Sequence, residues 1–429
     1  MVSEVVAPTR SGSRGEGSAN EETQLSERNR RANDRGTRRA RVAIAGGSLG
    51  GLTAALLLRD LGLDVTVYER SPAELEQRGA GIGFLPASYR YLVERAGRSL
   101  DAISVATSHI RYLARSGEVI HDLEHPYRFS AWNTVYRELL ACFGRERYRL
   151  GHEMVSFEAQ ADHVAVAMAD GRLDHVDLLV CADGVASRSR RHLVPDAHAR
   201  YAGYVAWRGM VPERSLDAST RNALDDAITY FVYANSHILV YPIPGADGSI
   251  EPGKRLMNFV WYRNYLEGGD LDTLLTDANG LRHETSMPPG AAQPAHVADL
   301  HATAEARLPP QIADVVLAVD APFVQVIYDI EVSRMAFGRV CLIGDAAWVA
   351  RPHAAAGTAK AGADAWTLAE ALDAHGTVPE ALAAWEPGQL ELGRQLVERT
   401  RGIGCRSQVE GTWRPGDPEL IFGLYGPGR

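Results

Sequence analysis

The feature that most constrains this chain is a glycine-rich turn at residues 46–51, which joins an apolar run at 41–45 to an apolar stretch at 52–61. The run predicts a buried parallel strand, and the stretch predicts a helix. A second strand is expected at 64–68, and Glu69 follows it directly. This order of strand, glycine turn, helix, strand and acid is typical of a βαβ unit that binds an ADP-containing dinucleotide. A chance turn is the alternative.

The residue types in and after the turn match that chemistry. Its glycines let the backbone approach a pyrophosphate, and the helix N-terminus offers free N–H groups and a positive potential. The carboxylate of Glu69 is placed to accept hydrogen bonds from ribose hydroxyls. Ser48 replaces the usual middle glycine, and its hydroxyl can reach a phosphate oxygen. The expected cofactor contacts here are Gly46, Ser48, Leu49, Gly51, Glu69 and Arg70.

The bulk properties exclude several classes of protein. The 429 residues, 45% of them hydrophobic, suffice for two or three domains, and the net charge of −9 argues against a nucleic-acid or membrane-surface partner. The 4 cysteines and 14 histidines show no metal-ligand spacing, so we expect no metal site and a reducing, cytoplasmic setting. Residues 1–40 are polar and lack the apolar core of a signal peptide, so a disordered extension is expected.

The pattern along the chain predicts a discontinuous α/β architecture. A Rossmann-like domain is expected over 41–200 and again over 333–403, where a strand at 340–343 and a final long helix at 379–401 complete it. Between them, at 201–332, longer aromatic strands with Pro- and Gly-rich turns predict an inserted antiparallel sheet. Its strands are expected at 201–211, 229–233, 237–242, 256–262 and 323–330, and its helices at 271–280 and 296–319. Residues 404–429 are expected to form a C-terminal tail.

No second dinucleotide fingerprint is found. Residues 79–84, Gly-Ala-Gly-Ile-Gly-Phe, have the wrong spacing and follow a charged segment, so we interpret them as a tight loop beside the cofactor.

Two further motifs follow the first in a fixed order: Asp183-Gly184 after an apolar strand, and Gly344-Asp345 after another, with Pro352 and an Ala/Gly run at 354–358 beyond it. With the fingerprint, they resemble the FAD-dependent aromatic hydroxylases, the single-component flavoprotein monooxygenases, over about 41–403. Segments 201–205, 241–245 and 351–357 are similar, within that family, to hydroxylases of dihydroxypyridines.

The resemblance implies an FAD-binding domain of the glutathione-reductase type, and a role for each matching residue. Asp345 would accept a hydrogen bond from a ribityl hydroxyl, and the helix N-terminus near Thr358 would face the flavin pyrimidine. Arg137 would reach the phosphates, and Asp183 would lie where flavin and nicotinamide meet. The residues carried over are Arg137, Asp183, Asp345, Pro352, Gly357 and Thr358. A helix cap for Asp345, an ordinary turn at Asp183 and a surface position for Arg137 stay open.

The activity implied is that of a monooxygenase, which uses transiently bound NAD(P)H and O₂ to hydroxylate a small electron-rich aromatic or N-heteroaromatic ring through a flavin hydroperoxide. Other flavin oxidoreductases on the same fold, such as epoxidases or reductases, and a non-catalytic flavin sensor are the alternatives. A homodimer is left open, and no residue is identified as a catalytic base. The pocket candidates are Tyr204, Trp207, Tyr241, Asn258 and Trp261.

The strand pattern also bears on the substrate. If the tryptophans face the pocket, we expect Arg208 and Arg263 to face away from it. A pocket without a cation favours a hydroxypyridine over a benzoate.

Overall fold

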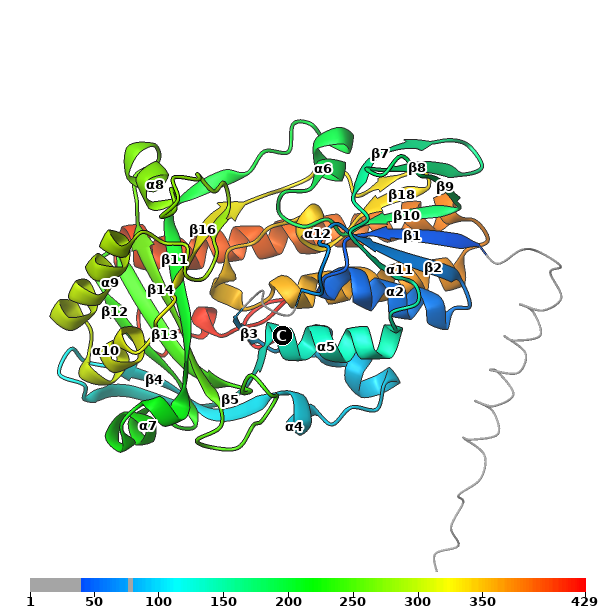
Figure 1. Cartoon of the computed structure of the whole chain (residues 1–429). Helices are drawn as coiled ribbons and strands as arrows, with labels where there is room; N and C mark the ends of the chain where they lie inside the picture. Colours follow the sequence, from blue (N-terminus) through cyan, green and yellow to red (C-terminus); the bar gives the residue numbers. More distant parts are fainter. Residues whose placement is uncertain (1–39, 76–79) are drawn as a thin grey trace, which may run out of the picture. The chain divides into compact units, whose positions relative to one another are not determined.

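Two large sheets organise the part of the chain that the computed structural model describes, residues 40–75 and 80–429 (Figure 1). Six strands in the order β17-β18-β10-β1-β2-β6 form one sheet, and nine in the order β15-β16-β11-β14-β13-β12-β4-β5-β3 form the other. A small third sheet contains β7 (Met154–Ala159), β8 (Val164–Met168) and β9 (Leu173–Val176). The extension expected over 1–40 lies, except for Ala40, outside the described residues.

The six-stranded sheet confirms the predicted Rossmann-like unit. Its central strand β1 (Arg41–Ala45) is parallel to both neighbours, β2 (Asp64–Glu69) and β10 (Leu178–Cys181). Strand β10 pairs in parallel with β18 (Val340–Leu342), which brings the late segment of the chain beside the early one. The remaining strands are β6 (Tyr148–Leu150) and β17 (Ala336–Phe337).

Helix α2 (Leu49–Asp60) follows β1, and helix α11 (Gly357–Ala374) follows β18. The two helices pack closely at Gly50, where an added Cβ would lie only 3.0 Å from Cβ of Ala361. Helix α5 (Trp132–Phe143) lies against α2 (Figure 1). The predicted final helix is α12 (Val378–Cys405), which packs on α11.

The nine-stranded sheet contains the predicted aromatic strands, with a core on each of its faces. Its later strands are β11 (Arg200–Pro212), β12 (Ala227–Tyr233), β13 (Ser236–Ile243), β14 (Leu256–Asn264), β15 (Ser286–Met287) and β16 (Phe323–Asp329). One face packs on helices α9 (Pro294–Arg307) and α10 (Pro310–Leu317). The other face, which we call the aromatic face, carries tyrosines of β4, β11, β12, β13 and β14. Pairing is antiparallel except between β12 and β4.

Three strands of this sheet come from before residue 201. They are β3 (Gly81–Gly83), β4 (Val105–Leu113) and β5 (Val119–Ala131). The loop expected at 79–84 is wrong for residues 81–83, because their backbone pairs with β5 at Gly81↔Ala131 and Gly83↔Phe129. We therefore propose that residues 81–131 belong to the sheet domain together with residues 201–332.

Two predicted helices of the sheet domain differ from the observed ones. The helix expected at 296–319 is split into α9 and α10, since Pro309 and Pro310 lack the N–H groups that would continue it. The one expected at 271–280 is shorter, α8 (Gly269–Leu274).

The other short helices are α3 (Pro86–Arg90), α4 (Leu100–Ile103), α6 (Arg188–Leu193) and α7 (Ala218–Leu224). Within the described ranges, no helix has both the length and the apolar character needed to cross a membrane.

Candidate functional site

The glycine turn lies at the carboxyl end of β1, against the end of β10. Gly46 has φ +104°, and a Cβ there would lie 2.2 Å from the carbonyl oxygen of Ala182. A Cβ at Gly51 would lie 1.9 Å from the carbonyl oxygen of Gly46. Only glycine fits either position, so the turn is as tight as a close approach of backbone to a pyrophosphate requires.

Glu69 holds this turn in place. Its Oε2 accepts a hydrogen bond from the N–H of Gly47 at 2.9 Å, and its Oε1 accepts one from the N–H of Ser71 at 2.9 Å. Each carboxylate oxygen keeps a lone pair for a ribose hydroxyl. Ser48 is the N-cap of α2 but makes no capping hydrogen bond with its side chain, so its hydroxyl is available to a ligand. Arg70 is exposed.

Asp345 lies beyond β18 in a short 3₁₀ turn, Gly344–Ala346. Asp345 is exposed to solvent, although many protein atoms lie around its carboxylate. Those surroundings raise its pKa to about 6, against the lowering influence of Arg190 and Lys360. Within the described chain its carboxylate has no hydrogen-bond partner, which leaves it free for a ribityl hydroxyl.

Helix α11 begins near this turn, because Asp364 of the helix accepts a hydrogen bond from the N–H of Gly344. Its N-cap, Ala356, has no capping side chain, and Gly357 is exposed, so the first N–H groups of the helix are open to a ligand. The hydroxyl of Thr358 lies 2.9 Å from that of Ser88. Pro352 begins the 3₁₀ turn that precedes the helix, and Ala355 adopts φ +53°, a conformation that alanine rarely takes. This loop, 351–356, is therefore held in a specific shape.

Lys360 is 2% exposed in the first turns of α11. Its Nζ lies 2.5 Å from Oδ1 of Asp364, and Oδ2 of Asp364 accepts the N–H of Gly344 at 2.8 Å. The buried pair thereby fixes α11 against the turn that carries Asp345.

Asp183 and Arg137 are already engaged with the protein. Asp183 accepts hydrogen bonds from the hydroxyl of Ser187 at 2.6 Å and from the N–H and hydroxyl of Ser189 at 3.1 and 3.0 Å. Arg137 donates to the carbonyl of Ala246 at 3.0 Å. These hydrogen bonds support the alternative that Asp183 belongs to an ordinary turn. A cofactor role for Asp183 or Arg137 stays a prediction.

The five pocket candidates divide between the two faces of the nine-stranded sheet. Tyr204 and Tyr241 lie on the aromatic face, whereas Trp207 and Trp261 are buried in the core against α9 and α10. Asn258, opposite Tyr241 in the β13–β14 register, reaches β3 from the same face as Tyr241. We therefore leave the two tryptophans out of the proposed pocket.

Three side chains of this sheet hold Gly81. Its N–H donates to Oδ1 of Asn258 at 2.9 Å, and its carbonyl accepts from the Tyr241 hydroxyl at 2.9 Å and from Nη2 of Arg208 at 2.7 Å. Arg208 is thus on the aromatic side, because it alternates with Trp207, while Arg263 pairs with Asp299 at 2.9 Å near α9. Arg208 therefore lies opposite Trp207, as the alternation predicts, whereas Arg263 shares the face of Trp261, two residues before it in the strand. Because neither tryptophan lies on the aromatic face, the condition of the expectation is not met, and Arg208 lies on that face.

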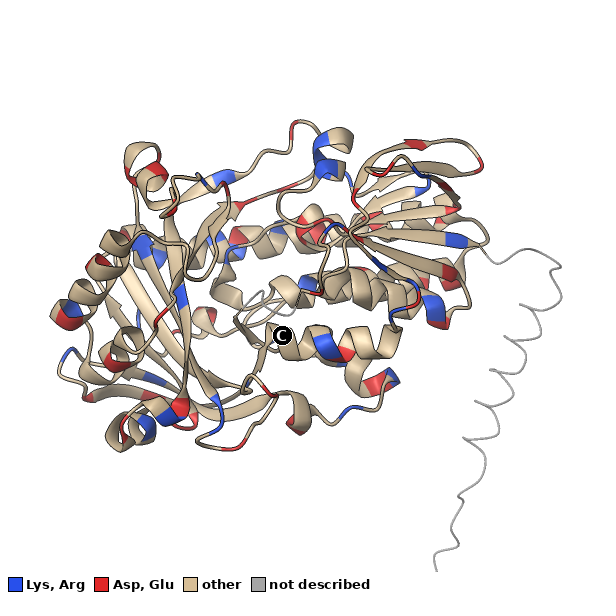
Figure 2. Cartoon of the chain, viewed as in Figure 1, with Lys and Arg blue, Asp and Glu red and all other residues tan. Residues whose placement is uncertain are grey.

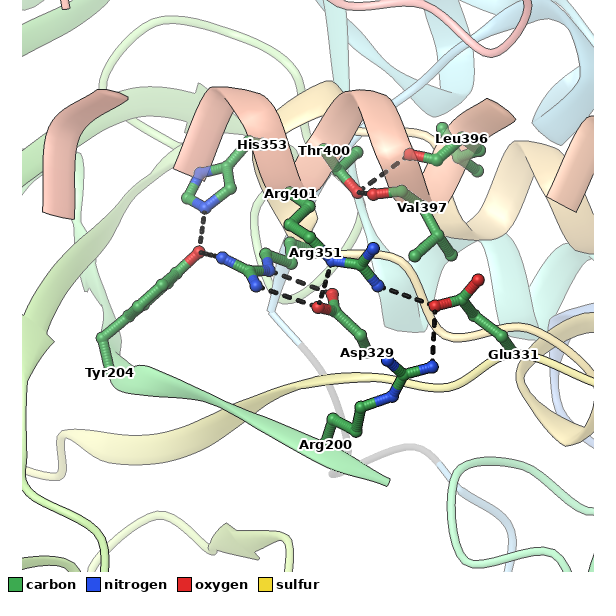
Figure 3. A network of polar contacts seen from close by, with 10 residues as sticks. All are labelled: Arg200, Tyr204, Asp329, Glu331, Arg351, His353, Leu396, Val397, Thr400 and Arg401. Atoms are coloured by element: carbon green, nitrogen blue, oxygen red, sulfur yellow. Dashed lines mark hydrogen bonds and ion pairs between the residues drawn. The ribbon is translucent and has the colours of Figure 1, made fainter. Parts of the chain in front are cut away.

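A polar network joins Tyr204 to the loop at 351–356 (Figure 3). The hydroxyl of Tyr204 lies 2.7 Å from Nε2 of His353 and accepts a hydrogen bond from Nη1 of Arg351 at 3.3 Å. Arg351 forms a two-bond pair with Asp329, at 3.0 and 2.9 Å, and both residues are buried. Nε of Arg401 of α12 donates to Oδ2 of Asp329 at 3.0 Å. The network therefore ties this loop to β11, β16 and α12.

The electrostatics of the network follow from its burial. Removal from water raises the pKa of Tyr204, and the nearby charge of Arg351 opposes that rise. Burial, with His237 and Arg351 as further causes, holds the pKa of His353 well below its usual range. His353 is therefore neutral at pH 7.

Sequence reasoning gave no site role to Arg351, His353 or Arg190. Arg190 is 4% exposed, and its Nη1 donates to the carbonyls of Asp345 and Ala346, both at 3.2 Å. Arg351 and His353 belong to the segment 351–357 that resembles the family, so the sequence does contain a signal for these two residues.

The residues present fit an FAD molecule. The turn at 46–51 admits no side chain at Gly46 or Gly51, and Asp345 offers an exposed carboxylate without a partner among the described residues. Two helix N-termini without capping side chains lie on adjacent helices. All of these features lie at the carboxyl edge of the parallel strands, where open α/β sheets bind nucleotides.

The chain is similar to proteins of known function along most of its length. A family model described as FAD binding domain-like matches residues 201–329. The chain is 40% identical over 385 residues to the 2,6-dihydroxypyridine 3-monooxygenase of Paenarthrobacter nicotinovorans, covering 90% of this chain and 96% of that relative. It is 30% identical over 410 residues to the 3-amino-4-hydroxybenzoate 2-monooxygenase of Streptomyces cremeus, covering 90% and 95%. The solved structure of 2,6-dihydroxypyridine-3-hydroxylase from Arthrobacter nicotinovorans matches with a TM-score of 0.86 at 38% identity, covering 91% and 98%.

Proposed function

We propose that this chain, which belongs to the FAD-dependent aromatic hydroxylases, acts on a small hydroxylated N-heteroaromatic ring of the 2,6-dihydroxypyridine type. The family membership makes it an FAD-dependent monooxygenase that consumes NAD(P)H and O₂. The observation that carries the choice of ring is the 40% identity, over 90% of the chain, to a relative with that substrate in its name.

FAD, when bound and reduced by NAD(P)H, would activate O₂, one atom of which enters the ring while the other leaves as water. The chain's own residues bind and orient. We assign the pyrophosphate to the backbone of 46–51 and the N-terminus of α2, the adenosine ribose to Glu69, and the ribityl chain to Asp345. The open N–H groups at Gly357 and Thr358 would favour negative charge on the flavin pyrimidine.

The aromatic face excludes water from the ring. Tyr204, Tyr241 and their tyrosine neighbours are at most 9% exposed, so a substrate there meets apolar rings and few hydroxyls. A neutral or weakly acidic heterocycle needs no full counter-charge in such a site.

Arg208 makes a carboxylated phenol the second candidate. It lies on the aromatic side, and among the described residues no carboxylate pairs with it. However, its Nη2 is bonded to the carbonyl of Gly81, and its Nη1 donates to Oε1 of Gln325 at 3.0 Å. Both ends of the guanidinium are thus engaged, which favours the uncharged ring.

A substrate panel separates the two candidates. We expect 2,6-dihydroxypyridine to stimulate NAD(P)H oxidation more than phenols and carboxylated phenols do. A stronger response to a hydroxybenzoate, lost in Arg208→Gln, would contradict the proposed ring and support the second candidate. NAD(P)H oxidation that no ring stimulates would support the sensor.

We also propose that the protein is a cytoplasmic homodimer without a nucleic-acid or membrane partner. The net charge of −9 supports the absence of a nucleic-acid or membrane partner, as does the mixture of acidic and basic residues along the described chain (Figure 2). Size-exclusion chromatography with light scattering tests the homodimer.

A further inference from the structure

Residues 411–424, which we call the C-terminal segment, cover the aromatic face. Sequence reasoning assigned them only to a tail. The side chains of Trp413, Leu420 and Phe422 are 6%, 7% and 6% exposed, and all three belong to the core on this face. In Figure 1 the end of the chain, marked C, lies beside β3.

Phe422 extends a row of aromatic rings that begins on the sheet. Its ring stacks on that of Tyr127 with centroids 4.7 Å apart, and its N–H donates to the Tyr127 hydroxyl at 2.8 Å. The ring centroids of Tyr127 and Phe129 are 6.0 Å apart, and the ring of Phe129 stacks on that of Tyr241 with centroids 4.3 Å apart. This row ends at Gly81, to which the Tyr241 hydroxyl is bonded.

Trp413 covers a second part of the face. Its ring centroid is 4.6 Å from that of His237 and 6.0 Å from that of Tyr230. Its Nε1 donates to the hydroxyl of Tyr112 at 3.3 Å. Trp413 is therefore fixed by contacts on β4, β12 and β13.

The same segment contacts the loop that precedes α11. The N–H of Gly423 donates to the carbonyl of Ala354 at 3.1 Å. A Cβ at Gly83 would lie 2.5 Å from Cβ of Ala355 and 3.7 Å from Cδ2 of Phe422. The C-terminal segment, strand β3 and the loop at 351–356 thus meet at one place.

Polar groups without partners lie on the face that the segment covers. The hydroxyls of Tyr230 and Tyr262 make no hydrogen bond with any residue that the structure describes. Nδ1 of His237 accepts from the Gln408 amide at 3.2 Å, so the ring proton is on Nε2, which also has no partner there. The His237 ring stacks on Tyr262 at 4.5 Å and packs against Trp413, which places these groups together.

We propose that the C-terminal segment forms a wall of the substrate pocket, in which Trp413 and Phe422 select the size of the ring and the Tyr230 and Tyr262 hydroxyls bind its polar atoms. The inference rests on the proposed function for its substrate class. A planar ring with two oxygens flanking a nitrogen matches two hydroxyls and an imidazole N–H between aromatic walls.

The test measures binding without turnover, through the change that a ring causes in the absorbance of oxidised FAD in the purified holoenzyme. The probes are 2,6-dihydroxypyridine and a bicyclic dihydroxyquinoline. We expect Phe422→Ala to weaken binding of the pyridine about tenfold, as loss of a stacked wall implies, and to strengthen binding of the bicyclic ring. Trp413→Phe, which keeps an aromatic ring, should change the ratio of the two dissociation constants less than Phe422→Ala does.

Tyr425→Ala is the matched control, since Tyr425 is three residues from Phe422 but 56% exposed, and it should leave both constants unchanged. Tyr262→Phe should weaken the pyridine without changing FAD affinity. If Phe422→Ala weakened the binding of both rings equally and also weakened FAD binding, the proposal would be overturned. The segment would then only stabilise the loop at 351–356.

The outcome for the proposed function is separate. If the wild-type enzyme binds neither probe, the proposed ring is wrong, and the ring selected by the substrate panel replaces the pyridine. A change of size preference in Phe422→Ala for that ring would still support the wall, and no change would overturn it.

Discussion

The hydroxyl of Tyr204 lies 2.7 Å from Nε2 of His353 and accepts a hydrogen bond from Nη1 of Arg351 at 3.3 Å. Tyr204 belongs to β11 of the nine-stranded sheet, and His353 to the loop before α11. This single contact therefore couples the sheet to the loop that we assign to the flavin.

Tyr204→Phe removes the hydroxyl and leaves two buried polar groups, on Arg351 and His353, without their partner. We expect the free energy of unfolding to fall by roughly 1–3 kcal/mol, the usual cost of such groups. Urea denaturation followed by tryptophan fluorescence measures it. Tyr425→Phe, at an exposed position, should stay within about 0.5 kcal/mol of the wild type. Equal stability of the two variants would mean that the contact is not maintained in solution.

Acid should destabilise the protein through its buried histidines. Burial lowers the pKa of His237 to about 3, against about 6.5 in an unfolded chain. Between these values the unfolded state binds the extra proton, so stability is full above pH 6.5 and is lost as the pH falls. Each such group contributes a slope of up to about 1.4 kcal/mol per pH unit.

His237→Asn retains an acceptor for Gln408 and removes the titrating group. We expect its free energy of unfolding to fall less steeply between pH 7 and pH 5 than that of the wild type. Parallel curves for the two proteins would show that His237 does not titrate with unfolding.

Asp345→Ala should weaken FAD binding. Loss of one charge-assisted hydrogen bond costs roughly 1.5–3 kcal/mol, which corresponds to about a 10- to 150-fold rise in the dissociation constant. Because its pKa is raised to about 6, the carboxylate of the FAD-free protein is protonated below that pH and ionised above it. Wild-type affinity should therefore weaken on acidification through pH 6, and the variant should lack this step. Unchanged affinity would assign Asp345 a purely structural role.

The cofactor-binding half of the fold can be predicted from the sequence because short-range steric and hydrogen-bonding requirements determine it. The turn at 46–51 needs glycine at positions 46 and 51 for steric reasons, and Glu69 ends the very next strand. These residues lie close together in the chain, so the sequence motif alone identifies the binding unit.

The sheet half is less readable because its decisive contacts are tertiary. Alternation places Tyr204 and Trp207 on opposite faces, but it does not state which face packs on helices. Strand β5 escaped prediction since its first half, with Asp122, Glu124 and His125, is polar and largely exposed. Asp183 follows its strand as the family pattern requires, yet only the structure shows that Ser187 and Ser189 occupy its carboxylate.

The central claim is that the enzyme inserts one oxygen atom from O₂ into a hydroxypyridine ring. The direct measurement is mass spectrometry of the product formed from 2,6-dihydroxypyridine, NAD(P)H and ¹⁸O₂ by the FAD-loaded protein. We predict a product with one added ¹⁸O per molecule, formed in equal amount to the NAD(P)H consumed. NAD(P)H oxidation that yields only hydrogen peroxide and leaves the pyridine unlabelled would contradict the account.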